Sequence, residues 1–591
     1  MKLPRHRAIS FAPFLGECRE YTVSYLGRDL WASLAVALMA IPQSIAYSLL
    51  AGLPPTAGIF SAIFGTIFAA AFGSSRHLVS GPSTGTAILI QTSIAEILNA
   101  YYETAIGAEK ERIVLHILTQ IVVIVGIIQI LAAFFNVAKL LQFVSRPVVL
   151  GYFAGITVAI IATQLFYFTG ISLSKETGLV LFKVGFFFSH LLQLQWPTLL
   201  MGILSFGFLI LFRRVAKNLP DALLMLVIAS VAAYGVSYFF PNITFLRFGT
   251  YASVEGPIPS LTLPLLDFSL LNKVFPAAVA ISFLAILEAF SVSRDFAAKS
   301  GHHVQVNQDV FGLGIANAAL SFVYGALPAS GSATRTTLSY RMQAKTRLAA
   351  VLSGLFTGII IFFFWPFVQY IPLAALAALL IATVPMLVNW KEIRLCFHAT
   401  REDASVFLIT FISCLIFSLD IAFFIGIVIS IATYLRKSST PHLVEYAFNS
   451  KGRLMIVSPK EDIHRKVRII GISGELYFAS ADFFQNALQS VAEDPKTLAI
   501  VLRLNNIYHM DASMCLAILR LFNQLQSSGR YLVISGLTEE VWHVFHRAGL
   551  VKQIGLDNLY FTDETNPQFS TWKACLKAQE LIHMKEGDTP K

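Results

Sequence analysis

Long apolar runs recur from Leu30 to Leu435, and their lengths predict membrane-spanning helices. A straight helix needs about 20 apolar residues to cross the hydrocarbon core, and several of these runs are shorter. The segments around 79–98 and 328–343 are also interrupted by Gly, Pro and Ser, which a membrane tolerates only where the irregular backbone lines a cavity. The pattern therefore predicts a transport site. The predicted segments cover 30–51, 56–73, 79–98, 113–136, 146–168, 196–213, 220–240, 272–292, 310–326, 332–343, 348–367, 371–388, 404–419 and 421–435.

Basic residues indicate how these segments cross. With a cytoplasmic N-terminus and fourteen crossings, 21 Lys and Arg residues fall in inside loops and 6 in outside loops. Cytoplasmic loops of membrane proteins carry this excess, and losing one span would scramble the alternation after it. We therefore expect both termini on the cytoplasmic side of a multi-pass protein in the cell membrane (plasma or inner membrane).

After Arg436 and Lys437 the pattern changes to short apolar strands that alternate with amphipathic helices. This order predicts a small α/β domain with a mixed sheet. Strands are expected at 454–457, 467–472, 498–504 and 531–534, and helices at 480–492, 512–528, 538–548 and 566–584. We divide the chain into a cytoplasmic N-terminal segment (1–29), a transmembrane transport domain (30–437) and a cytoplasmic C-terminal domain (438–591).

Composition supports a bilayer as the solvent for most of the chain. Of 591 residues, 56% are hydrophobic and 13% charged, about half the charged share of an ordinary soluble protein. The net charge of +10 fits basic cytoplasmic loops better than nucleic-acid binding. The five cysteines form no metal-binding spacing, and the nucleotide-binding glycine motifs are missing from the C-terminal part. We expect no enzyme activity, no bound cofactor or metal, and no nucleic-acid partner.

An internal echo is the most informative motif. Residues 80–86 read Ser-Gly-Pro-Ser-Thr-Gly-Thr and residues 330–336 read Ser-Gly-Ser-Ala-Thr-Arg-Thr, so four of seven positions match at an offset of 250. Each stretch opens the third segment of a seven-segment half. Because seven is odd, the halves form an inverted repeat, and two broken helices would aim their N-termini at one shared anion site. The alternative is that these small residues only allow close helix packing.

Two charged residues stand near mid-depth in apolar segments, Glu288 and Arg335. Charges at this depth usually face a cavity. Arg335 lies in the second of the echoed stretches, where a guanidinium adds charge-assisted hydrogen bonds to an oxyanion. Glu288 cannot attract an anion, but a carboxyl group in an apolar site can carry a proton. The alternative for both is a static ion pair that braces the segments.

In the first segment, Gln43 and Tyr47 are four residues apart and share a helix face, at about the depth of Glu288. Both side chains can donate hydrogen bonds to a ligand. Spacing alone does not separate that role from interhelical packing.

Several motifs together resemble the sulfate permease (SulP) family of anion transporters. They are Ile41-Pro-Gln-Ser-Ile-Ala-Tyr-Ser-Leu-Leu-Ala-Gly-Leu-Pro-Pro55, Gly73-Ser-Ser-Arg-His77 and the two echoed stretches. The resemblance covers nearly the whole chain and implies an α-helical membrane protein of fourteen segments in a 7+7 inverted repeat, shared with uracil permeases. It further implies a core domain that moves against a gate domain in an elevator-like cycle, a homodimer, and a C-terminal STAS domain that could bind cytoplasmic regulators.

The resemblance also implies residue roles. Gln43, Tyr47, Ser83, Thr84, Thr334 and Arg335 match substrate-binding positions, with Thr334 in place of the commoner Ser. Glu288 matches an acidic position associated with proton coupling. Bicarbonate relatives coupled to sodium have Asp there, so Glu favours protons as the coupling ion and leaves sodium as the alternative.

The STAS resemblance depends on Leu502-Arg-Leu-Asn-Asn-Ile-Tyr-His-Met-Asp-Ala-Ser513. Ser513 matches the phosphorylatable position of anti-sigma-factor antagonists, although Met514 replaces the Gly that normally follows. The alternatives are a helix N-cap formed by Ser513 or by Asp511.

Together these features predict a proton-coupled secondary transporter of a small anion, namely sulfate or a related oxyanion, bicarbonate or a dicarboxylate. A sodium-coupled bicarbonate transporter, an anion sensor and an uncoupled channel are the alternatives. A nucleobase permease of the same fold would have a carboxylate where this chain has Arg335.

Overall fold

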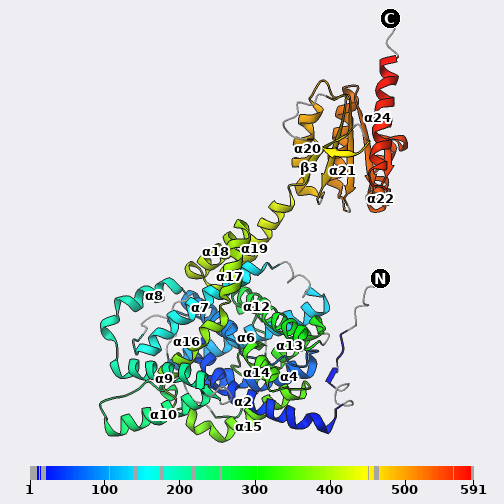
Figure 1. Ribbon diagram of the computed structural model, residues 1–591. Coiled ribbons are helices and arrows are strands. Elements are labelled where there is room, and N and C mark those ends of the chain that lie inside the picture. Colours follow the sequence, from blue (N-terminus) through cyan, green and yellow to red (C-terminus); the bar gives the residue numbers. More distant parts are fainter. Residues whose placement is uncertain are drawn as a thin grey trace. The chain divides into compact units, whose positions relative to one another are not determined.

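The computed structural model (Figure 1) forms two compact units, Met1–Ser430 and Ile431–Lys591. It describes residues 9–11, 13–14, 21–104, 107–137, 144–172, 179–215, 220–251, 256–264, 266–301, 304–449, 452–457, 465–474, 476–507, 509–563 and 565–587. Most of residues 1–20 lie outside the described ranges, so the expected N-terminal segment is described only in part.

Each of the fourteen predicted segments coincides with helical structure. The helices are α2 (Val23–Ala51), α3 (Pro55–Phe60) continuing through a π-helical turn at Ser61–Gly65 into α4 (Thr66–Phe72), α5 (Thr84–Tyr101), α6 (Gly107–Phe134), α7 (Arg146–Thr169), α9 (Trp196–Val215), α10 (Asp221–Phe239), α12 (Phe268–Ser300), α13 (Val306–Leu320), α14 (Ala333–Arg341), α15 (Leu348–Val368), α16 (Leu373–Leu387), α18 (Arg401–Ile416) and α19 (Leu419–Ser438). Shorter helices that were not predicted are α8 (Val180–Ser189), α11 (Phe248–Tyr251), α17 (Trp390–Ala399) and a 3-10 turn at Leu191–Gln193.

Ten helices within the described ranges are long and apolar enough to cross a membrane. The nine residues of α14 rise about 14 Å, roughly half of a hydrocarbon core. This helix is one of the two interrupted segments of the sequence, and a short strand precedes it. The helical membrane fold is confirmed, whereas fourteen full crossings in an inverted repeat stay a prediction.

The helices of the first unit pack in two groups. In one, α6 packs against α12 and α13, and α2 packs against α5, α14 and α15. In the other, α7 packs against α16 and α18, and α9 packs against α10 and α16. Each group joins helices from both halves of the chain, and α2 of the first group also contacts α10 and α16 of the second.

The second unit has the mixed sheet that the sequence predicts. The strands β3 (His442–Phe448), β4 (Leu454–Ile456), β5 (Val467–Ser473), β6 (Ala499–Asn506), β7 (Tyr531–Leu537) and β8 (Leu559–Phe561) lie in the order β4-β3-β5-β6-β7-β8. The β3 strand is antiparallel to both neighbours, and the pairs from β5 to β8 are parallel.

Five helices accompany this sheet: α20 (Phe478–Ala492), α21 (Ala512–Ser527), α22 (Glu539–Arg547), α23 (Leu550–Ile554) and α24 (Phe569–Gly587). A 3-10 turn at Leu556–Asn558 follows α23. The expected strands and helices are all present, and β3, β8 and α23 are additions to the prediction.

Candidate functional site

The two echoed stretches of sequence lie side by side. Ser80–Gly81 forms strand β1 and Ser330–Gly331 forms strand β2, and the two are antiparallel. Ser80 is paired with Gly331 and Gly81 with Ser330, which is a register symmetric between the two copies. Two further bonds extend the contact, from the Ser332 N–H to the Val79 carbonyl and from the Val79 N–H to Thr336 Oγ1, both 3.0 Å.

A helix begins just after each strand. Ser83 is the N-cap of α5, and its hydroxyl accepts the Thr86 N–H at 3.2 Å. Ser332 is the N-cap of α14 and accepts the Arg335 N–H at 3.4 Å.

The serine caps leave other backbone donors free. In the described part of the chain, the N–H groups of Thr84 and Gly85 on α5 and of Ala333 and Thr334 on α14 have no hydrogen-bond acceptor. The first N–H groups of a helix lack partners within the helix and carry the positive end of its dipole. Two pairs of donors are therefore available to an anion. Ala333 is exposed, so the start of α14 is accessible from outside the protein.

The helix α2 connects the two helix starts. Gln43 Nε2 lies 3.5 Å from Thr334 Oγ1, and the phenol of Tyr47 lies within hydrogen-bonding reach of the Thr84 side chain. Because residues four apart on a helix lie about 6 Å from each other, these contacts place Thr84 and Thr334 around one small region. Gln43 Oε1 is buried and accepts no hydrogen bond from a described residue.

Glu288 enters this region from α12. Its carboxylate accepts a hydrogen bond from the Ser330 hydroxyl of β2 and lies against the Ser83 side chain. It also lies beside the first turn of α5, where a Cβ added to Gly85 would be 2.6 Å from Glu288 Oε1. Glu288 therefore contacts both echoed stretches.

Arg335 is 1% exposed and reaches from α14 to the other stretch. Its Nη2 donates to the Pro82 carbonyl at 2.7 Å, while its buried Nε donates to no described residue. Gly81, with φ of +143°, makes room for the guanidinium, because a Cβ there would lie 2.6 Å from Nη1. Within the described ranges, no ion pair of 4.0 Å or less joins Arg335 to Glu288, so the static pair that was the sequence alternative does not form.

Sequence reasoning missed two groups that position the site. Ser330 binds Glu288, as described above. Asn317 of α13 is fully buried and brackets Ala329, donating to its carbonyl at 3.1 Å and accepting its N–H at 2.7 Å, while also donating to Gln129. Asn317 could have been singled out from the sequence, because burying a lone amide in the apolar run 310–326 is costly unless the amide is hydrogen-bonded.

In the C-terminal unit, Asp511 is the N-cap of α21. Its Oδ1 accepts the Met514 N–H at 3.0 Å, and its Oδ2 accepts the Phe478 N–H of α20 at 2.7 Å. Ser513 therefore lies inside the first turn and is half-buried, and it does not cap the helix. Its phosphorylation stays a prediction.

Both units match known protein families. Residues 26–410 match the profile described as the sulfate permease family, and residues 450–565 match the STAS domain. The chain is 26% identical to sulfate transporter 4.1, chloroplastic, of Arabidopsis thaliana over 94% of this chain and 82% of that protein.

Solved structures show the same fold. The murine Slc26a9 anion transporter in the inward-facing state matches with a TM-score of 0.86 at 18% identity, covering 98% of this chain and 97% of that one. The transmembrane domain of BicA, a bicarbonate transporter of a cyanobacterium, matches with a TM-score of 0.59 at 20% identity, over 70% of this chain and 98% of that one.

Proposed function

Because the chain belongs to the sulfate permease family, we propose that it is a secondary active transporter that couples the movement of a small anion to protons. The candidate anions are sulfate or a related oxyanion, bicarbonate and dicarboxylates. All of them suit a site made of backbone N–H groups, hydroxyls and one guanidinium.

The observation that carries this proposal is the antiparallel pairing of Ser80–Gly81 with Ser330–Gly331. It brings two helix N-termini, from opposite halves of the chain, to the same place. An anion between them would accept hydrogen bonds from the free N–H groups and from the hydroxyls of Thr84 and Thr334, with Gln43 and Tyr47 as further donors. Ser83 holds the first turn of α5 in place.

Glu288 supplies the coupling in this proposal. A carboxylate beside the anion repels it, and a proton on the carboxylate removes that repulsion. The proton and the anion therefore load together, and both leave when the site opens to the side of lower concentration. Sodium is the alternative coupling ion, because the Glu288 carboxylate and the Ser330 and Ser83 hydroxyls are oxygen ligands.

The loaded site would move with the helices that carry it. We propose that a core domain of segments 1–4 and 8–11 (α2 to α6 and α12 to α15) moves as one body against a gate domain of segments 5–7 and 12–14 (α7, α9, α10, α16, α18 and α19), in an elevator-like cycle. In the proposed setting the protein is a homodimer in the cell membrane, with residues 1–29 and 438–591 cytoplasmic and residues 30–437 within the transport domain. The STAS domain would then offer a surface to cytoplasmic regulators.

Reconstituted vesicles test the proposal. Labelled sulfate, bicarbonate and succinate are offered separately to vesicles that contain the purified protein, with an inward proton gradient, an inward sodium gradient or neither. We expect one of these anions to accumulate above its equilibrium level only with the proton gradient. Accumulation that requires the sodium gradient instead would show that sodium, and not the proton, is the coupling ion. Binding without flux would indicate a sensor, and conductance far above carrier turnover would indicate a channel; either result would overturn the proposal.

A further inference from the structure

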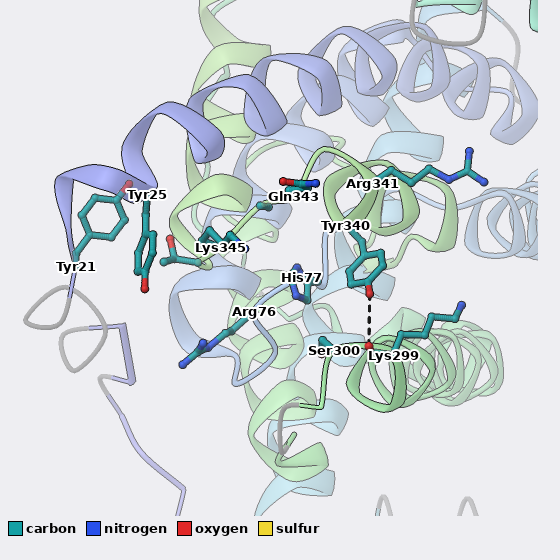
Figure 2. Close-up of a pocket in the computed structure, with 12 residues that line it drawn as sticks. Tyr21, Tyr25, Arg76, His77, Lys299, Ser300, Tyr340, Arg341, Gln343 and Lys345 are labelled. Carbon is teal, nitrogen blue, oxygen red and sulfur yellow. Dashed lines mark hydrogen bonds between the residues drawn. The ribbon is translucent and has the colours of Figure 1, made fainter.

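A polar cavity of about 830 Å³ lies away from the anion site, where four segments of the first unit meet. The basic residues at its wall come from different segments: Arg76 and His77 after α4, Lys299 at the end of α12, and Arg341 and Lys345 at and after the end of α14. In Figure 2, Lys299 and Arg341 lie on one side of the His77–Tyr340 pair, and Arg76 and Lys345 lie on the other. Among the described residues that line the cavity there is no Asp or Glu.

Nearby carboxylates neutralise only part of this charge. Asp295 lies 3.9 Å from Lys299 Nζ. Asp29 accepts the Lys345 backbone N–H at 2.7 Å and the Thr346 hydroxyl at 2.6 Å, so it binds groups of the cavity wall other than the charged side chains. Within the described ranges, the charged ends of Arg341 and Lys345 have neither a hydrogen bond nor an ion pair. Among the described residues, the wall of the cavity therefore carries an excess of positive charge.

The wall is held in shape by aromatic contacts. Tyr340 donates its hydroxyl to the Lys299 carbonyl at 3.4 Å, which joins the end of α14 to the end of α12. The Tyr340 ring meets the His77 ring edge to face, with 5.3 Å between centroids, and lies 5.3 Å from the Phe296 ring. These contacts fix the segments that carry the basic residues relative to one another.

One side of the cavity borders an apolar surface. Tyr21 lines the cavity just before α2 and Tyr25 lines it in the first turn, and Val23, Leu26 and Trp31 within the first nine residues of the helix are 85%, 39% and 72% exposed. Exposed aromatic and aliphatic residues beside basic groups are typical of the level where a membrane meets water. A volume of about 830 Å³ is also in the range for a drug-sized ligand, and far exceeds what an inorganic anion fills.

We propose that this cavity binds the phosphate-bearing headgroup of an anionic phospholipid, with the acyl chains lying along the exposed apolar turns of α2. All four segments are predicted to lie on the cytoplasmic side, where anionic lipids concentrate. Because α12 carries Glu288 and α14 carries Arg335, a bound headgroup would link the ends of two helices that each contribute a residue to the anion site. Lipid binding would hold these helices together.

The test uses the purified full-length protein in neutral detergent. It is titrated with dioctanoyl phosphatidylglycerol, with dioctanoyl phosphatidylcholine and with inorganic phosphate, and bound lipid is read from native mass spectra and from the midpoint of thermal unfolding. The variant is Arg341→Gln with Lys345→Gln, because the charged ends of both side chains have no partner among the described residues. The matched control is Lys391→Gln with Arg394→Gln, which removes two exposed charges from α17.

We expect phosphatidylglycerol, and not phosphatidylcholine, to bind and to raise the unfolding midpoint. Each basic residue contributes about 1 kcal/mol to such contacts, so the double variant should bind about 30-fold more weakly. The control should bind normally, and Arg341→Lys should retain binding because it keeps the charge.

Three other results are decisive. Equal binding of both lipids would overturn the proposal, as would a loss in the control that matches the loss in the cavity variant. The third result is saturation of the cavity by inorganic phosphate alone, with the same dependence on Arg341 and Lys345. That result would support a phosphate site but would contradict the proposal that a lipid headgroup occupies it. Since no transport is measured, these outcomes are independent of the proposed transport function.

Discussion

The guanidinium of Arg335 donates a hydrogen bond of 2.7 Å to the carbonyl oxygen of Pro82, a residue 253 positions earlier in the chain. The bond joins the second echoed stretch to the first, and Gly81 lies directly under the guanidinium. Arg335 therefore combines two tasks. It holds the two helix starts together, and it provides the positive charge of the site.

Replacing Arg335 separates these tasks. Arg335→Lys keeps the charge but loses the planar fork of donors, and we expect it to weaken anion binding about tenfold. Arg335→Gln also removes the charge, and we expect at least a hundredfold loss. The anion concentration that gives half-maximal counterflow in vesicles measures both. Arg112→Gln, an exposed site on α6, is the control, and an equal effect of all three changes would contradict this role.

Gly85→Ala should damage transport although it favours the helix. In the first turn of α5 alanine is a better helix former than glycine by about 1 kcal/mol, but its Cβ would lie 2.6 Å from Glu288 Oε1. We expect the carboxyl group to be displaced and proton-driven accumulation to fall at least tenfold, with the unfolding midpoint unchanged. Gly235→Ala in α10, where nothing lies within 4 Å of the new Cβ, should behave as the wild type. Normal transport by Gly85→Ala would contradict the position of the Glu288 carboxyl group beside the first turn of α5.

Asp511 and Ser513 should differ in their effect on the C-terminal unit. Asp511→Ala removes the N-cap of α21 and a bond to α20, so we expect it to lower the free energy of unfolding of this unit by about 1–2 kcal/mol. Ser513→Ala should change it by less than about 0.5 kcal/mol. Urea unfolding followed by circular dichroism measures both. A larger loss for Ser513→Ala would assign the capping role to Ser513 instead.

The thiol of Cys515 should resist alkylation. Burial, and secondarily the Asp511 carboxylate, raises the pKa of this thiol to about 11. At pH 8 its thiolate fraction is then about 200-fold smaller than that of a free cysteine of pKa about 8.5. Labelling with iodoacetamide, followed by peptide mass spectrometry, should be slow in the native protein, rise toward pH 11 and become fast in urea. A native labelling profile centred near pH 8.5 would contradict the burial of Cys515.

The sequence was sufficient to predict those structural features whose pattern repeats or persists over many residues. Apolar runs located every long helix of the first unit, and alternation located four of the six strands of the second. The helix α17 was missed because Trp390–Ala399 has apolar residues on one face only and mixes in charges, so its average hydropathy is low. The strand β8 has only three residues and leaves little periodicity to read.

The site was predictable as a set of residues but not as a geometry. The echo around Ser80 and Ser330 indicated that two stretches act together, because equivalent positions in repeats meet at the repeat interface. It could not reveal that they pair as strands, since a two-residue strand has no local pattern. Nor could it show that Arg335 binds the Pro82 carbonyl while Glu288 binds the Ser330 hydroxyl, because both bonds depend on how α12 and α14 pack.

The most direct test of the account compares wild-type protein with Glu288→Gln in sealed vesicles. Two quantities are measured for the transported anion: accumulation driven by an inward proton gradient, and counterflow exchange without any gradient. The uncharged amide mimics the protonated carboxyl group, so we predict that accumulation is lost while exchange continues. Glu103→Gln, at an exposed position after α5, should retain both. Gradient-driven accumulation that persists in Glu288→Gln would contradict the claim that a proton on Glu288 accompanies the anion.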